Sequence, residues 1–239
     1  MSNVISGAIK ATIKDIRKNL TEKFQDNIKC IILYGSWIKG SAREDSDIDL
    51  LVVFDRINKE TGKSVHNILN SIKTERSITI VPSSLKDFQN EKLPLYTAVK
   101  KEGKVIYGDV DFSINPEPPR IKYSEFFKRS HEFESQKIKI AEELLEKNIT
   151  SGSADLCFVA SKHAIQAALA MKGKGYSSKI KILLPLTERY FGKAIAQAFK
   201  KLFELYIKSE YSMEFLKEEE IKLAIEYAKK ILEVYQRDA

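Results

Sequence analysis

Apolar residues in the first half of the chain follow two different periods. From Ile5 to Phe24 they recur every three or four residues, as on one face of an amphipathic helix. The runs "KCIILY", "DIDLLVVF" and "SITIV" are continuous and rich in β-branched residues, which is typical of buried strands. A helical repeat from Val65 to Ile72 separates the last two, and a helix over 94–101 and a short strand in "GKVIYGD" follow. The pattern predicts an α/β (α+β) domain with a small mixed sheet.

The segment "NPEPPR", from Asn115 to Arg120, places three prolines together. Proline lacks a backbone donor and disfavours helix before it, so we expect a boundary between domains 1–115 and 116–239. The second half shows only helical repeats and predicts an all-α, up-down bundle of four or five antiparallel helices. One of its predicted apolar stripes comprises Phe126, Phe127, Phe133, Ile138, Ala141 and Leu145.

Composition and charge limit the partners and the cellular compartment that we expect for the protein. The net charge of +7 is spread without a dense basic run, which permits a polyanionic partner without requiring one. Cys30 and Cys157 lie in apolar runs without metal-ligand spacing, so we expect buried free thiols in a reducing compartment. Charged residues interrupt every apolar run near the N-terminus, so we expect neither a signal peptide nor a membrane span. These features predict a cytoplasmic protein with no membrane partner.

Candidate chemistry is concentrated in "GSWIKGSAREDSDIDL", which begins at Gly35. Its two glycines imitate a P-loop, but Ser41 stands where that motif requires lysine. Asp45, Asp47 and Asp49 imitate the first ligands of a calcium loop, but that loop needs glycine at position 50 and glutamate at position 56, where this chain has leucine and arginine. The P-loop is therefore disfavoured, and a calcium loop of this type is excluded.

A phosphate and metal site fits the whole segment. If "CIILY" is a strand, Gly35 lets the chain turn at its end, and Ser36 opens a short helix whose amides and hydroxyl face a phosphate. On the next strand Asp47 and Asp49 would point to one face, about 7 Å apart. Two such carboxylates suit Mg²⁺ or Mn²⁺, which also bind triphosphate oxygens.

Cations in the intervening loop would complete this site. Lys39 and Arg43 would neutralise charge on the phosphates. Simpler structural roles remain open for these residues: solvent-facing aspartates, ordinary surface cations, a helix-capping Ser36 and a buried Trp37 beside it.

The segment resembles the signature of the nucleotidyltransferase superfamily related to DNA polymerase β, in its minimal archaeal and bacterial branch. The resemblance rests on glycine-serine, about ten residues, then Asp-x-Asp opening an apolar strand, and spans roughly the first 110 residues. It implies magnesium-dependent transfer of a nucleoside monophosphate from a nucleoside triphosphate, such as ATP, to a hydroxyl-bearing acceptor. Asp47 and Asp49 would hold the metal, and Gly35 and Ser36 the phosphates. The acceptor is left undefined.

The second half resembles a HEPN domain, in "ASKHAIQAALAMKGKGY" and "KSEYSMEFLKEEEIKLAIEYAKKILEVY". Bundles of this family often pair, so the resemblance allows a homodimer. Its nucleases carry an arginine four to six residues before a histidine, and no arginine precedes His66, His131 or His163 at that spacing. Ribonuclease activity is therefore disfavoured. His163 lies on an apolar stripe, so we expect a hydrogen-bonded core or interface histidine.

One departure from the polymerase β pattern affects the function. Members usually place a third carboxylate on a neighbouring strand, and here Thr79, or alternatively Ser77, occupies that position. A hydroxyl ligates magnesium poorly and cannot act as a base at neutral pH. One alternative to the enzyme is therefore a catalytically weak, regulatory nucleotide-binding module. A second is an RNA-binding protein that uses the basic helical half, including "KGKGYSSKIK".

Overall fold

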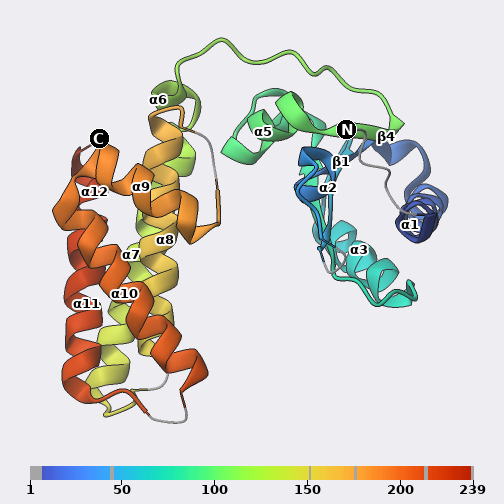
Figure 1. Ribbon diagram of the computed structural model, residues 1–239. Coiled ribbons are helices and arrows are strands. Elements are labelled where there is room, and N and C mark those ends of the chain that lie inside the picture. The colour runs from blue at the N-terminus through green and yellow to red at the C-terminus, as the bar shows by residue number, and fades with distance from the viewer. Residues whose placement is uncertain (1–6, 44–45, 151, 175–176, 213–214, 238–239) are drawn as a thin grey trace. The chain divides into compact units, whose positions relative to one another are not determined.

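The computed structural model describes residues 7–43, 46–150, 152–174, 177–212 and 215–237. The chain divides into two compact units, Met1–Pro116 and Glu117–Ala239, and the division falls within the proline-rich segment (Figure 1). Each unit has its own hydrophobic core.

A mixed sheet forms the centre of the first unit. Its strands among the described residues are β1 (Ile28–Tyr34), β2 (Ile48–Phe54), β3 (Ile78–Ser84) and β4 (Lys104–Gly108). Their order is β3-β2-β1-β4; β1 pairs antiparallel with β2 and β4, and β2 pairs parallel with β3. The parallel pair is joined through a helix, as a crossover connection requires. Pro82, which cannot donate to a ladder, lies in the edge strand β3. The predicted mixed sheet is confirmed.

Helices cover both faces of this sheet. They are α1 (Gly7–Phe24), the 3-10 turn η1 (Gln25–Asn27), α2 (Ser36–Lys39), α3 (Lys59–Ser71), α4 (Leu85–Gln89) and α5 (Pro94–Glu102). Alternate residues of β2 serve different cores: Leu50 and Val52 face α1 and α3, whereas Leu51 and Val53 face α4 and α5. All four are fully buried, so the continuous apolar run of β2 reflects a strand covered on both sides.

A buried ion pair anchors the end of the first unit. Glu91 is fully buried and adopts a φ of 50°, which is uncommon outside glycine. Its Oε1 accepts from Lys100 Nζ at 3.1 Å and from the Asn115 backbone N–H at 2.7 Å, while Thr97 donates to Oε2. The same ammonium donates to the Ser113 carbonyl at 2.7 Å. Charge and hydrogen bonds thus hold the chain segment that leaves β4 against α5.

The second unit is a helical bundle, as predicted. Its helices are α6 (Pro119–Lys122), α7 (Ser124–Glu146), α8 (Ser153–Met171), α9 (Ile180–Phe191), α10 (Lys193–Tyr211), α11 (Glu218–Leu232) and α12 (Val234–Arg237). Helix α8 packs against α7, α10 and α11 (Figure 1). Its Ala160, Ala164, Ala167 and Ala168 are fully buried, and such small side chains let neighbouring helices approach closely.

The predicted stripe on α7 is wrong at Phe133, whose side chain is 62% exposed. The buried positions Phe127, Glu134 and Ala141 recur every seven residues. Phe133 lies one residue, or about 100° around the helix, away from that line. The aromatic run suggested a wider apolar face than the bundle buries.

Cys30 and Cys157 are buried free thiols, as predicted. No helix in the part of the chain that the structure describes is long and apolar enough to cross a membrane.

Candidate functional site

A glycine turn brings the end of β1 against an aspartate of β2. Gly35 follows Tyr34 with φ 80° and ψ −147°, near a region that only glycine readily adopts. A Cβ built on Gly35 would lie 2.2 Å from Asp49 Oδ2. The carboxylate therefore occupies the space that any side chain at position 35 would need. Glycine is required here both for its backbone angles and for this close approach.

Asp49 and Asp47 form a pair of neighbouring carboxylates. Asp49 lies in β2 on the same side of the sheet as Leu51 and Val53, and Asp47 lies just before the strand, exposed to solvent. Partial burial, followed by the negative charge of Asp47, raises the pKa of the Asp49 carboxyl above its ordinary value. The two charges are thus close enough to repel, and a cation between them would relieve that repulsion.

Tyr34 adds a neutral phenol to this side of the site. It is the cross-strand partner of Asp49, so both side chains project from the same face. Burial, followed by the Asp49 charge, raises the pKa of Tyr34 to about 12, which keeps its hydroxyl protonated at neutral pH. The sequence pattern did not identify Tyr34, because as the last residue of an apolar run it had no chemical signal of its own.

Thr79 occupies the position beside Asp49 on the other neighbouring strand. The two are direct partners in the parallel ladder of β2 and β3, whereas Ser77 precedes β3. No group of three or more histidine, cysteine, aspartate or glutamate side chains suited to a metal occurs among the described residues. Two carboxylates still fit magnesium, which commonly binds through one or two carboxylates together with substrate phosphates.

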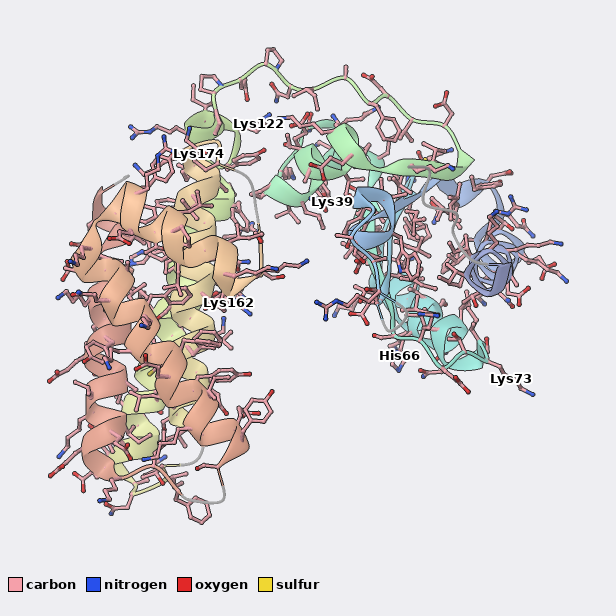
Figure 2. The ribbon with its side chains drawn as sticks, in the orientation of Figure 1. Lys39, His66, Lys73, Lys122, Lys162 and Lys174 are labelled. Atoms are coloured by element: carbon pink, nitrogen blue, oxygen red, sulfur yellow. The ribbon has the colours of Figure 1, made fainter. Side chains whose placement is uncertain are left out.

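The two predicted phosphate-binding cations differ from the carboxylates in their surroundings. Lys39, which is labelled in Figure 2, lies at the end of α2. It pairs with Glu102 of α5, with Nζ 2.7 Å from Oε2. Their side chains keep 55% and 50% of their surface exposed, and pairs this exposed contribute about 0–1 kcal/mol, so an anion can compete for Lys39. Arg43 is exposed, and its backbone N–H donates to Ser46 Oγ at 2.8 Å.

Ser36 opens α2, as expected. It is half-buried, and its carbonyl accepts from the Ser41 N–H at 3.1 Å. Asp45, which the calcium-loop alternative used, lies outside the described residues. The structure thus joins Gly35 to Asp49 and Asp49 to Asp47, and it gives the Lys39 ammonium a different partner, Glu102.

In the second unit, His163 of α8 belongs to a polar cluster. Its Nδ1 lies 3.2 Å from Oε1 of Glu134, and Lys137 Nζ lies 2.5 Å from Oε2 of the same carboxylate. Glu134 keeps only 5% of its side chain exposed, so both neighbours help to compensate a buried acid. This agrees with the expected hydrogen-bonded histidine.

Basic and aromatic side chains also meet at one end of this unit. Lys174 Nζ lies 5.3 Å and Arg189 Cζ 5.5 Å from the Tyr190 ring centroid, and Lys122 and Lys174 are labelled near each other in Figure 2. Tyr176 of the predicted lysine-rich loop lies outside the described residues. The Tyr190 ring thus already engages both Lys174 and Arg189.

Substitution of Gly35 by alanine tests the close approach to Asp49. We expect Gly35→Ala to destabilise the protein by about 1–3 kcal/mol, because the backbone is strained and the carboxylate must move. We also expect it to weaken Mn²⁺ binding, measured by electron paramagnetic resonance of the free ion. The matched control is Gly152→Ala, since Gly152 also has a φ of 80° but a Cβ added there would meet no atom within 4 Å. Equal Mn²⁺ affinity in Gly35→Ala and wild type would contradict this account of the site.

Asp49→Asn tests the repulsion between the carboxylates of Asp47 and Asp49. Folding raises the pKa of the Asp49 carboxyl. The folded state therefore loses stability as the pH rises from the pKa of the unfolded state to the higher pKa of the folded state. Asp49→Asn should therefore raise the thermal midpoint of the metal-free protein at neutral pH, and this gain should disappear below pH 3.8. Asp87 is the control of opposite sign, because the hydrogen bond from Lys92 lowers its pKa. Asp87→Asn should lower the midpoint at neutral pH, and a lower midpoint in Asp49→Asn as well would contradict the proposed repulsion.

Two family models match the chain. The polymerase β nucleotidyltransferase model matches residues 14–112, and the HEPN domain model matches residues 135–238. A putative protein adenylyltransferase of Methanocaldococcus jannaschii is 46% identical over 43 residues, which is 18% of this chain and 43% of that protein. The protein adenylyltransferase MntA of Thermococcus cleftensis is 39% identical over 49 residues, which is 20% of this chain and 48% of that protein. The matches thus span just under half the length of these curated relatives.

A solved structure shares the fold. The spectinomycin adenyltransferase of Enterococcus faecialis, determined with ATP and spectinomycin, aligns with a TM-score of 0.52 and 16% identity, covering 94% of this chain and 99% of that chain. At this identity the likeness concerns architecture alone. The matches along the sequence go further: this chain carries a domain of the polymerase β nucleotidyltransferase family, followed by a HEPN domain.

Proposed function

We propose that this protein is a metal-dependent nucleotidyltransferase that transfers a nucleoside monophosphate from a nucleoside triphosphate to a hydroxyl-bearing acceptor. The observation that carries the proposal is the placement of the Asp49 carboxylate against the Gly35 backbone, with the charge of Asp47 beside it. This arrangement joins a turn suited to phosphate with a pair of acids suited to a cation, within one family-matched domain.

In this proposal Asp47 and Asp49 hold Mg²⁺ or Mn²⁺. Such a cation, when bound, neutralises phosphate charge and favours attack at phosphorus. Gly35 and Ser36 place backbone and hydroxyl donors at the phosphates. Lys39 and Arg43 then supply positive charge to the same oxygens, for which Lys39 exchanges its exposed partner Glu102 for the nucleotide.

The acceptor oxygen attacks the α-phosphorus of the nucleotide. A new oxygen–phosphorus bond forms, the bond from the α-phosphorus to the bridging oxygen of the β-phosphate breaks, pyrophosphate leaves, and the acceptor's proton passes to solvent. We infer ATP as the donor, because the curated relatives are named protein adenylyltransferases.

The same names favour a protein hydroxyl as acceptor. The hydroxyl at Thr79 cannot take the acceptor's proton at neutral pH. A phenol, with a pKa near 10, releases its proton more readily than an aliphatic alcohol does, so a tyrosine is the acceptor best suited to this site.

A nucleic acid is an alternative acceptor in this proposal, through the hydroxyl of a terminal ribose. Action in the cytoplasm and pairing through the helical unit belong to the same proposal.

A second candidate function is nucleotide binding with slow turnover. The direct pairing of Asp49 with Thr79 favours it, because a positioned base contributes about 10²- to 10⁴-fold to a rate. Loss of that base would leave the phosphate turn and two acids intact. Binding and group transfer therefore have to be measured separately.

Asp47→Asn tests the enzymatic proposal. We expect this change to abolish the transfer of radioactive label from α-labelled ATP with Mg²⁺ to acceptor proteins in a cell extract, because one of two cation ligands is lost. Asp55→Asn is the control, since Asp55 is an exposed acid directly after β2, at its opposite end. Undiminished transfer by Asp47→Asn would remove the basis of the proposal. Wild-type binding of the nucleotide without any transfer would instead support the second candidate.

Thr79→Asp tests the effect of the missing acid. A carboxylate beside Asp49 would restore both a cation ligand and a base, so we expect label transfer to rise by about 10²-fold or more. Thr79→Asn is the matched control, because it has a similar shape without the charge. Equal transfer rates for these two variants would show that position 79 does not limit turnover.

A further inference from the structure

Trp37 connects the phosphate turn to the chain that carries the carboxylates. It is the single tryptophan of the protein and lies in α2. Its ring is half-buried against the core beneath α1 and α3. Its Nε1–H donates to the Asp47 carbonyl at 2.9 Å, with the Ser46 carbonyl further away at 3.4 Å. A side chain from one half of the site thus binds the backbone of the other half.

This hydrogen bond acts on a part of the chain that strand pairing does not hold in place. The ladder between β2 and β3 begins at Ile48, which pairs with Ile78, so Asp47 lies just outside regular pairing. Asp49, two residues later, is fixed by strands on both sides and by the approach of Gly35. The two carboxylates are therefore held by different means, and the indole hydrogen bond acts on the less constrained one.

Arg76 supports the indole from the segment that leads into β3. Its guanidinium carbon lies 5.7 Å from the Trp37 ring centroid, a distance at which a cation attracts an aromatic face. Its Nη1 is buried and has no hydrogen-bond partner within the described residues. The backbone here is also fixed, because the Ser77 carbonyl accepts from the Ile48 N–H at 3.0 Å. Packing on Trp37 is thus the side-chain contact that the described residues give this arginine.

We propose that Trp37 and Arg76 are positioning residues that set the direction of the Asp47 carboxylate. The indole N–H fixes the backbone at Asp47, and the Arg76 guanidinium restricts the orientation of the indole. The proposal rests on the proposed function, since it assumes that Asp47 binds a cation. It adds two residues that touch neither the cation nor the reacting atoms, yet determine how well the pair of acids is arranged.

The first test is the Mn²⁺ affinity of the full-length protein, measured by electron paramagnetic resonance. Trp37→Phe keeps an aromatic ring and removes the N–H donor, so we expect affinity to fall about threefold to tenfold, the usual worth of one hydrogen bond. Arg76→Gln should reduce affinity, and Arg76→Lys, which keeps a cation over the ring, should restore part of it. Arg189→Gln is the matched control, because Arg189 stacks on Tyr190 at 5.5 Å in the other unit and should leave affinity unchanged.

The second test uses the indole itself as a probe. Because the chain has one tryptophan, its indole N–H gives a single side-chain resonance in a nitrogen-15 correlation spectrum. We expect Mg²⁺ to shift this resonance in the wild type, and we expect Arg76→Gln to shift it before any metal is added. A tryptophan with a merely structural role, remote from the bound cation, would not respond to Mg²⁺.

The outcomes separate this inference from the function on which it rests. If wild type and Trp37→Phe bind Mn²⁺ equally, or if Mg²⁺ binds without moving the indole resonance, the positioning role is overturned and the proposed function stands. If the wild type binds neither ion even with a nonhydrolysable triphosphate present, both proposals fall. Thermal midpoints of the variants are recorded alongside. If Trp37→Phe loses affinity because its fold collapses, while Arg76→Gln stays folded and keeps the wild-type affinity, the inference is also overturned.

Discussion

The approach of the Gly35 backbone to the Asp49 carboxylate is the contact on which the rest of the site depends. One strand ends and turns at a residue without a side chain, and the acid of the next strand fills the space thereby left open. Any larger residue at position 35 would have to displace the acid. The turn and the acid therefore form a single structural unit, although thirteen residues separate them in the sequence.

The burial of Asp49 beside Asp47 creates an electrostatic repulsion that a bound cation would relieve. Burial and the neighbouring Asp47 both disfavour the ionised form of Asp49, so the metal-free site contains repulsion that folding alone does not relieve. Among the described residues, Tyr34 stays neutral and Lys39 is paired with Glu102, so neither supplies a free positive charge to the two acids. A site that is electrostatically unfavourable when empty is typical of binding sites, since function often conflicts with stability.

The sequence predicted the parts of this arrangement that local chemistry determines. Continuous β-branched runs gave the strands, and a glycine after an apolar run gave the turn. The alternation that predicted one face for Asp47 and Asp49 applies within β2 to Asp49, because Asp47 lies just before the strand. Contacts between distant segments could not be obtained in this way. Nothing local links Lys39 to Glu102 or Trp37 to Arg76, because these pairs form only when helices and loops pack on the sheet. The prediction that Phe133 is buried was wrong for a related reason. An apolar residue is buried only if another element covers its side of the helix.

In the proposed function, a site with only two acids would depend on the nucleotide for part of its affinity for a cation. Magnesium prefers six oxygen ligands and gives up its water reluctantly, so two carboxylates alone form a weak site for the free ion. Thr79 offers only a hydroxyl where a third acid would stand. In the proposed function the remaining ligands would come from water or from the triphosphate, and the Gly35 turn that we propose for the phosphates lies directly beside Asp49. It follows that cation and nucleotide strengthen each other's binding, and that the precision with which Asp47 is held matters more here than in a site with three acids.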